Sequence, residues 1–323
     1  MGRYKNILLA FMMFVANTIR FTAIAQPNPN STTIKLINLY DAFGADKAGL
    51  KQDFGFSCLI EYKGKTILFD AGTNAETFRQ NLEALNIDPK TIDIAILSHG
   101  HYDHMGGLDY LVGVNPAVRI YLPNDFFSLG APVVFPFREA ETAVAKTLPK
   151  DEQYFRGQQV VEGMVTVPTG RFWRGNAVYL TKAEEVLPGL TIVPTTSQLM
   201  GTFIKYPPHA DNPQFIGLPE LSASFSSPKG QIIIAGCSHS TIETIIQETL
   251  KSRKENIYLV TGGFHLIPYD RAYIEELAKR MQKDYAVKSV APAHCTGHLG
   301  FSVFKQVFGD QYMFFGLGES LQF

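Results

Sequence analysis

The sequence predicts an α/β fold in which two β-sheets pack face to face and helices cover their outer sides. The main observation is that the order strand, strand, helix, strand occurs in the first half of the chain and again in the second half. A sheet with an apolar face must bury that face against another layer. Hydrophobic residues make up 46% of the 323 residues, which is enough to fill a core between two sheets.

The first half is predicted to start with an alternating strand followed by a hairpin. Lys63 and Gly64 separate two apolar runs and favour a tight turn between them. Thr73 or Asn74 can cap the next helix, in which apolar residues recur at helical spacing. The predicted strands are Thr33–Tyr40, Phe56–Tyr62, Lys65–Phe69 and Asp93–Leu97, and the predicted helix is Ala75–Leu85.

The second half repeats this order. Pro228, Lys229 and Gly230 predict the turn of a second hairpin. Ser240 and Glu243 have the spacing of a capping box ahead of an apolar helix face. The predicted strands are Ser222–Ser226, Gln231–Ala235, Asn256–Val260 and Val287–Ala291, and the predicted helices are Ser240–Lys251 and a second one that Asp270 caps.

The amino terminus has the pattern of a secretory signal peptide. Arg3 and Lys5 precede the apolar stretch Ile7–Ala16, and small residues at Ala23 and Ala25 suit a cleavage site. This predicts a signal peptide over residues 1–25, one domain over residues 26–323, and a periplasmic or secreted location. The apolar stretch is short for a bilayer span, so no stable membrane anchor is expected after cleavage; an uncleaved anchor is the alternative.

The middle of the chain, from about Asn115 to Pro219, is rich in proline, glycine and aromatic residues. Such a segment is typical of an elaborated cover over an active site rather than of a separate domain. For any single aromatic residue here, apolar filling over a sheet edge is the alternative.

Composition limits the partners of the protein. The net charge is −1, which gives no indication of a nucleic-acid partner. The three cysteines, Cys58, Cys237 and Cys295, are too few for a disulfide scaffold. Because their number is odd, at least one thiol is free or bound to a metal. The expected partner is a small-molecule substrate.

The run Ser98–Gly107 places three histidines and one aspartate within six positions, in the pattern H-x-H-x-D-H. Neutral imidazole and carboxylate are ligands that zinc prefers where a site stays open for chemistry. His99 and His101 are two residues apart, so in extended backbone their side chains project to the same side. Asp103 and His104 follow in a predicted turn before a short helix. This loop can therefore place two histidines on one metal ion and direct Asp103 and His104 to a second.

Further candidate residues follow the strands of the second half. His239 and His294 come directly after predicted strands and are expected to be metal ligands. Cys237 could bind zinc as a thiolate or only pack. His265 is expected to contact the substrate or to support a metal ligand, and a buried, hydrogen-bonded histidine is the alternative.

Four other residues have weaker indications. Asp70 ends a predicted strand and could orient metal ligands or cap a turn, which the residues alone do not separate. Cys295 is expected to be structural. His298 could face the substrate or the solvent, and His209, in the middle segment, is the weakest candidate.

Taken in order, these motifs resemble those of the metallo-β-lactamase superfamily. The motifs are Ser98–His104, Gly236–His239, Gly262–His265 and Pro292–Gly297, and the similarity extends over about Thr33 to Phe308. They look like the branch named after 7,8-dihydropterin-6-methyl-4-(β-D-ribofuranosyl)aminobenzene-5'-phosphate synthase. The resemblance implies a four-layer αβ/βα sandwich with a dinuclear metal site at one edge.

The resemblance also implies which residues bind the metals. The implied ligands are His99, His101 and His239 for one ion, and Asp103, His104 and His294 for the other. Many superfamily members carry a bridging aspartate after the glycine of the fourth motif, and this chain has Cys237 there. Two divalent ions are therefore expected, as zinc or, because such sites accept several metals, manganese or iron.

The leading hypothesis for function is a secreted or periplasmic metal-dependent hydrolase. A metal-bound hydroxide would attack an ester, amide or phosphoester, with Asp103 and His265 as the catalytic side chains. β-Lactam hydrolysis is not favoured, because the later motifs match a different branch and fold does not fix function.

Two alternatives come from other functional classes. One is a synthase of the branch, in which pyrophosphate is displaced; phosphate contacts could then come from Arg138, Arg171, Arg174 and Lys205. The export pattern is against it, because folate-like biosynthesis uses cytosolic precursors. The other is a non-catalytic protein that binds a metal or a ligand.

Overall fold

The computed structural model describes residues 33–124, 129–130, 133–135, 143–153, 163–165, 176–199, 203–204 and 215–323. The predicted signal peptide and much of the predicted cover segment lie outside these ranges. The same holds for His209 and for the four basic residues considered as phosphate contacts, Arg138, Arg171, Arg174 and Lys205.

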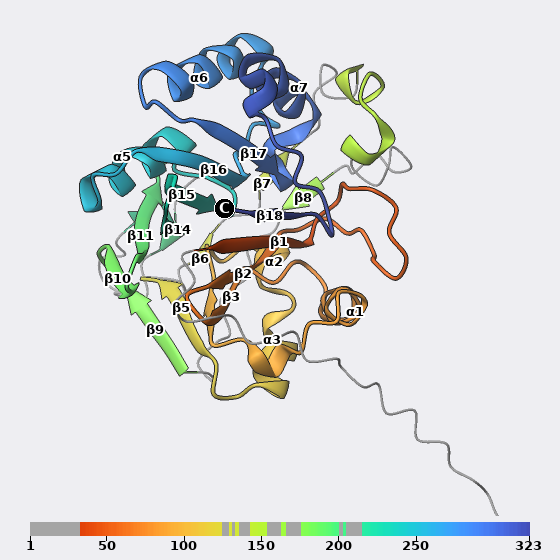
Figure 1. The fold of residues 1–323 in the computed structure, drawn as a ribbon, viewed down its shortest axis with the longest axis vertical. Helices are drawn as coiled ribbons and strands as arrows, with labels where there is room; N and C mark the ends of the chain where they lie inside the picture. Colours follow the sequence, from red (N-terminus) through yellow and green to blue (C-terminus); the bar gives the residue numbers. More distant parts are fainter. Residues whose placement is uncertain are drawn as a thin grey trace, which may run out of the picture.

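Two sheets lie at the centre of the molecule, and helices cover both outer sides (Figure 1). The first sheet has seven strands in the order β18-β1-β2-β3-β4-β5-β9. Neighbours from β18 to β3 run antiparallel, and neighbours from β3 to β9 run parallel. Its strands are β1 (Ile34–Tyr40), β2 (Ser57–Tyr62), β3 (Lys65–Phe69), β4 (Ile94–Ile96), β5 (Arg119–Pro123), β9 (Asn176–Leu180) and β18 (Ser320–Gln322).

The second sheet has six strands in the order β10-β11-β14-β15-β16-β17. Neighbours from β10 to β15 run antiparallel, and neighbours from β15 to β17 run parallel. Its strands are β10 (Glu184–Leu187), β11 (Leu190–Ser197), β14 (Leu218–Ser227), β15 (Gly230–Ala235), β16 (Ile257–Gly263) and β17 (Ser289–Ala293). Five shorter strands form two small sheets: β6 (Leu129–Gly130), β12 (Phe203–Ile204) and β13 (Phe215–Ile216) in one, and β7 (Val133–Phe135) and β8 (Gly163–Val165) in the other.

The helices belong to two outer layers (Figure 1). Those beside the first sheet are α1 (Ala75–Ala84), α2 (Tyr102–Met105) and α3 (Leu108–Val114), and those beside the second are α5 (Ile242–Ser252), α6 (Arg271–Lys283) and α7 (Gly297–Phe308). Short 3₁₀ turns span Pro89–Thr91, Lys150–Glu152, His294–Thr296 and Gly309–Gln311. No helix among the described residues is long and apolar enough to cross a bilayer.

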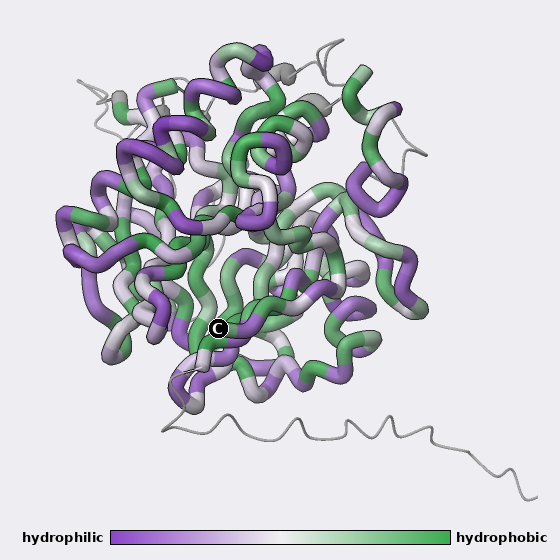
Figure 2. Tube along the Cα trace, turned by 45° about the horizontal axis from the view of Figure 1, so that its top comes forward, coloured by the Kyte–Doolittle hydropathy of each residue, from purple (hydrophilic) through white to green (hydrophobic). Residues whose placement is uncertain are grey.

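Three apolar clusters hold these four layers together. One lies between the sheets, where the ring of Tyr62 from β2 meets the ring of Phe225 from β14 edge to face at 5.2 Å. A second packs α1 and α3 against the first sheet, and a third packs α5, α6 and α7 against the second. Figure 2 shows the same division, with apolar strands inside and polar residues along the outer helices. The predicted four-layer sandwich is therefore confirmed.

Most predicted elements are confirmed within one or two residues at their ends, with two corrections. Asn74 caps α1 as predicted, because its Oδ1 accepts from the amides of Glu76 and Thr77. The predicted capping box at Ser240 is wrong: Thr241 caps α5, and Ser240 Oγ instead donates to the buried Glu220 at 2.6 Å. Helix α7 and strands β5, β9, β10, β11 and β18 were not predicted from the sequence, and β5, β9, β10 and β11 belong to the two main sheets although they lie in the segment predicted as a cover.

Candidate metal centre

The strand order brings the predicted site residues to one edge of both sheets. Strands β3 and β4 are parallel, and so are β15, β16 and β17. Parallel strands end at the same edge of their sheet, so the residues that follow them lie together. The residues concerned are Asp70 after β3, His99 to His104 after β4, His239 after β15, His265 after β16 and His294 after β17.

The chain turns sharply where these strands end. Asp70, Ser238, His265 and His294 have φ values of 59°, 63°, 49° and 48°. This is the left-handed region, which costs a non-glycine residue energy and is found where the surrounding structure imposes it. The packed sheet ends thus hold the site residues in conformations that the isolated chain would disfavour.

Three histidines form the first group of converging ligand atoms. His99 Nε2 lies 3.0 Å from His101 Nδ1, and His239 Nε2 lies 3.1 Å from each of these two atoms. All three side chains are buried. In a tetrahedral zinc site with Zn–N bonds of about 2.0–2.1 Å, the nitrogens are about 3.3 Å apart. The triangle of ring nitrogens therefore fits one divalent cation.

A second group lies beside the first. It contains Asp103, His104, Cys237 and His294, whose ligand atoms all lie within 4.8 Å of one another. His294 Nε2 is 3.2 Å from Asp103 Oδ2, and His104 Nε2 is 3.1 Å from Cys237 Sγ. Oδ1 of Asp103 is buried and has no hydrogen-bond partner within the described part of the chain. Carboxylate, imidazole and thiolate are all zinc ligands, so this group also fits a cation.

The two groups are adjacent in space. The rings of His99 and His104, one from each group, have centroids 4.3 Å apart. The structure therefore brings together all six residues implied as ligands: His99, His101, Asp103, His104, His239 and His294. It adds Cys237, which the sequence had left open as a ligand. Asp103 and His104 lie in α2 rather than in the predicted turn.

Asp70 belongs to neither ligand group of the described structure but forms hydrogen bonds that reach a histidine of each group. Its Oδ1 accepts from the amide of Ser98, and its Oδ2 lies 2.7 Å from both Ser98 Oγ and His104 Nδ1. Ser98 Oγ in turn contacts His99 Nδ1 at 2.8 Å. Carboxylates that bond the second nitrogen of a ligand histidine fix its tautomer and orientation. These contacts favour the orienting role of Asp70 over simple turn capping.

Two further buried acids hold the backbone of ligand residues. Glu220 accepts from the amides of His239 and Ser240, and Asp41 accepts from the amide of His294. Burial raises the pKa of Glu220, and burial raises the pKa of Asp41 to about 7. Neither residue was identified from the sequence, because Asp41 follows β1 and Glu220 lies within β14, and only the fold brings them to the amides of His294 and His239.

The electrostatics of the groups suit metal binding, with His294 as the exception: burial opposes its protonation, but Cys295 and Asp103 outweigh burial and raise its pKa to about 9, so a bound cation must displace its proton. Burial lowers the pKa of His101 to about 3, and burial with the neighbouring imidazoles holds the pKa of His99 and His239 well below the usual range. Burial opposes ionisation of Asp103, but His104 and His294 outweigh it and lower its pKa. Neutral imidazoles and an ionised carboxylate are the protonation states that bind a divalent cation.

Comparison with known proteins agrees with this geometry. Residues 50–214 match the family model of the metallo-beta-lactamase superfamily. The chain belongs to this superfamily. The resemblance inferred from the motifs is thereby confirmed.

Individual proteins are similar to this chain over most of its length. A Methanocaldococcus jannaschii protein named 7,8-dihydropterin-6-methyl-4-(beta-D-ribofuranosyl)-aminobenzene-5'-phosphate synthase is 30% identical over 298 residues, which cover 90% of this chain and 97% of the relative. An uncharacterized protein of the same organism is 26% identical over 78% of this chain and 88% of its own. A solved structure described as a metal-dependent hydrolase of the beta-lactamase superfamily matches with a TM-score of 0.66 at 23% identity, covering 89% of this chain and 98% of the other; this similarity concerns the fold alone.

The thiols set this member of the superfamily apart from those with a bridging aspartate. Cys237 Sγ lies 3.1 Å from Cys295 Sγ, and both side chains are buried. Together with His265 they form a third group of possible ligand atoms. Burial and the neighbouring Cys295 raise the pKa of the Cys237 thiol, whereas contacts with Cys237 and His294 outweigh burial and lower the pKa of the Cys295 thiol. Cys295 is thus next to the metal groups rather than only structural.

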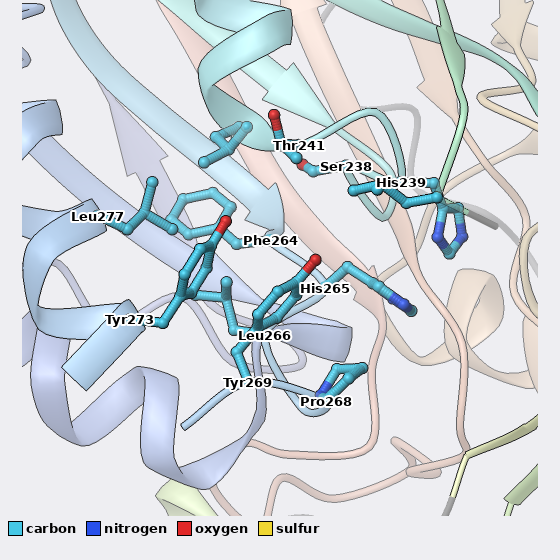
Figure 3. A pocket seen from close by; sticks show the side chains of 12 residues that line it. Ser238, His239, Thr241, Phe264, His265, Leu266, Pro268, Tyr269, Tyr273 and Leu277 are labelled. Carbon is cyan, nitrogen blue, oxygen red and sulfur yellow. The ribbon is translucent and has the colours of Figure 1, made fainter. Parts of the chain in front are cut away.

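The remaining predicted residues lie around this centre. His265 is close to the first group, with its ring centroid 4.3 Å from that of His239. His298 is buried in α7 and belongs to none of the three groups of possible ligands in the described structure. His239 and His265 also line a pocket that leads away from the centre towards α6 (Figure 3).

Proposed function

We propose that this chain is an exported, dinuclear metal-dependent hydrolase that acts on an ester, amide or phosphoester. The observation that carries the proposal is the pair of adjacent ligand groups, His99/His101/His239 and Asp103/His104/Cys237/His294. Two cations held so close together suit the stabilisation of both the attacking and the leaving oxygen of a hydrolysis. Zinc is the metal best matched to three imidazoles and to a mixed carboxylate, imidazole and thiolate set.

The residues of the site have two roles: they hold the cations, and they orient the attacking water and the substrate. When bound, the cations supply Lewis acidity and lower the pKa of water. Asp103 presents Oδ2 to His294 and keeps Oδ1 without a partner among the described residues, so Oδ1 is placed to accept a hydrogen bond from the attacking water and orient it. His265 lines the pocket beside His239, where it can contact the bound substrate.

Metal analysis joined to a substrate screen tests this proposal. The purified protein is expected to hold about two metal ions per chain, and His101→Ala and His294→Ala are each expected to hold about one. Ester, lactone, amide and phosphodiester substrates are compared at equal metal content. The matched control is His298→Gln, a buried histidine outside the ligand groups. Protein without bound metal, with hydrolysis unchanged in His101→Ala, would contradict the proposal.

The similarity to the curated relative favours a second candidate, a synthase that joins a dihydropterin to an aminobenzene riboside phosphate with release of pyrophosphate. The match at 30% identity over 97% of that relative supports it. Incubation with a dihydropterin diphosphate and the riboside phosphate separates the two candidates. Pyrophosphate release that depends on His101 would favour the synthase, and its absence beside ester or amide hydrolysis would favour the hydrolase.

Export is a separate part of the proposal. Its support is the sequence pattern of residues 1–25, with two cations, an apolar stretch and small residues before Gln26. Expression of the full chain followed by fractionation and amino-terminal sequencing tests it. A mature protein that starts near Gln26 is expected, and a chain that keeps Met1 in the cytosol would contradict it.

A further inference from the structure

We propose that the pocket beside His239 binds a neutral, planar aryl group of the substrate, so that this enzyme prefers aryl esters or arylacetyl amides. This inference rests on the proposed hydrolase function and names its substrate class. The pocket has a volume of about 120 Å³. A buried apolar cavity of about 150 Å³ binds benzene, so this pocket is of the size of a single aromatic ring.

Two stacked tyrosine rings line one side of the pocket. The rings of Tyr269 and Tyr273 are stacked, with centroids 4.2 Å apart and planes within 16° (Figure 3). Asp270 caps α6 by accepting from the amide of Tyr273, and the amide of Tyr269 donates to the carbonyl of Leu266. The backbone on both sides of the stacked pair is therefore fixed. Aromatic rings favour offset-stacked or edge-to-face contacts with such a surface.

The rest of the lining has no charge to offer a ligand. Apart from the two histidines, the twelve lining residues are apolar, aromatic or hydroxyl-bearing. Ser238 Oγ already donates to the carbonyl of Gly263 at 2.6 Å, and Thr241 Oγ1 already contacts Thr244 Oγ1 at 3.0 Å. A charged group placed here would lose its hydration without gaining a partner from these side chains. The pocket therefore favours a neutral ligand.

An exposed leucine at the rim supports an apolar ligand. Leu199 lines the pocket and has 65% of its surface exposed. Among the described residues, Leu199 and Tyr179 are the only exposed large hydrophobic residues, and Leu199 is the more exposed of the two. An exposed apolar side chain at the mouth of an apolar pocket is well placed to be covered when a ring binds.

The pocket also ends where the reaction would occur. His239, a member of the first ligand group, and His265 form its inner end (Figure 3). A ring bound against the two tyrosines would thus direct an attached carbonyl towards the metal centre. The geometry therefore favours a substrate whose reacting bond is attached near its ring.

Binding without turnover tests the inference separately from the hydrolase proposal. The zinc-loaded full-length protein is titrated calorimetrically with phenylacetamide, with cyclohexylacetamide, and with phenylacetamide that carries a sulfonate at the para position. Phenylacetamide is expected to bind about three- to tenfold more tightly than either analogue, because only it is both planar and neutral. Tyr269→Ala and Tyr273→Ala should each remove most of this preference.

Matched variants separate stacking from folding. Tyr269→Phe keeps the ring and should keep the preference, and Tyr179→Ala, an exposed tyrosine on β9, should leave it unchanged. Equal binding of the three amides, or no binding of any at millimolar concentration, overturns the inference. Tighter binding of 6-methylpterin than of phenylacetamide would also overturn it, in favour of a polar heterocycle. Selective binding together with no hydrolysis of any ester, lactone, amide or phosphodiester would refute the proposed function but not the ring site.

Discussion

Cys237 Sγ lies 3.1 Å from Nε2 of His104, although 133 residues separate the two in the sequence. The contact joins the loop after β15 to helix α2, and hence the two sheets, at the metal centre. Many members of the superfamily have an aspartate where this chain has Cys237. A thiolate offers one soft ligand atom in place of two carboxylate oxygens, so the metal preference of the second group depends on this residue.

Replacement of Cys237 is expected to remove a thiolate ligand from the second metal. Protein loaded with Co²⁺ should show a thiolate-to-cobalt absorption band in the near ultraviolet. Cys237→Ser should abolish this band and weaken binding of the second ion, because a hydroxyl stays protonated where a thiol ionises. Absorption spectra during cobalt titration measure both effects.

The other two cysteines are the controls for this experiment. Cys58→Ser alters a buried thiol outside the ligand groups of the described structure and should keep the band. Cys295→Ser removes only the neighbour of Cys237 and should keep the band with a shifted position. If the band is lost in Cys295→Ser but kept in Cys237→Ser, the thiolate ligand is Cys295 and the prediction for Cys237 is wrong.

Asp70 is expected to affect metal affinity without binding metal itself. Asp70→Asn replaces the acceptor that faces His104 Nδ1 and Ser98 Oγ with an amide that can present a donor. Loss of such a supporting carboxylate typically costs about 10–100-fold in metal affinity. Competition with a chromophoric chelator measures this, and Asp310→Asn, an exposed aspartate, serves as the control. Equal affinities for the two variants would show that Asp70 only closes a turn.

Much of the fold follows from local patterns. The hairpins at Lys63-Gly64 and Pro228–Gly230, and the caps at Asn74 and Asp270, are encoded within a few residues each, and all are found in the structure. Helix α7 was missed because it begins at Gly297 and contains Gly300, which lower helix propensity. Tertiary packing forms this helix instead, since Phe301 and Phe304 are fully buried.

The candidate ligands could be predicted from two signals, a local pattern and a position directly after a strand, as for His239 and His294. The pattern from His99 to His104 is local and identifies ligands directly. Asp41 and Glu220 carry no such pattern, and their roles depend on contacts with His294 and His239 made by the folded sheets. The Ser240 capping box failed for the same reason: the hydroxyl has a stronger, charged partner in Glu220 that lies on another strand.

Glu220 is expected to stabilise the loop that carries His239. Its two oxygens accept from the amide of His239 at 2.9 Å, the amide of Ser240 at 3.0 Å and Ser240 Oγ at 2.6 Å. In Glu220→Gln, an NH₂ group replaces one of the two accepting oxygens. At least one buried donor then loses its acceptor, which lowers the free energy of unfolding by about 1–3 kcal/mol. Urea unfolding measures the change. Glu255→Gln, at an exposed position, should cost much less, and equal losses would contradict this role.

The burial of His101 predicts a pH effect on the metal-free protein. Burial lowers the pKa of His101 to about 3 in the folded state, whereas an unfolded histidine has a pKa of about 6.5. As the pH falls from 7.5 to 5, the unfolded chain gains a proton at His101 and the folded chain does not, so folding loses about 2 kcal/mol at this residue. His101→Gln removes that titration while Asp41 and His294 titrate in both proteins. Urea unfolding after chelation should therefore show the stability of wild type relative to His101→Gln falling by about 2 kcal/mol over this range, and a constant difference would mean that His101 is readily protonated in the fold.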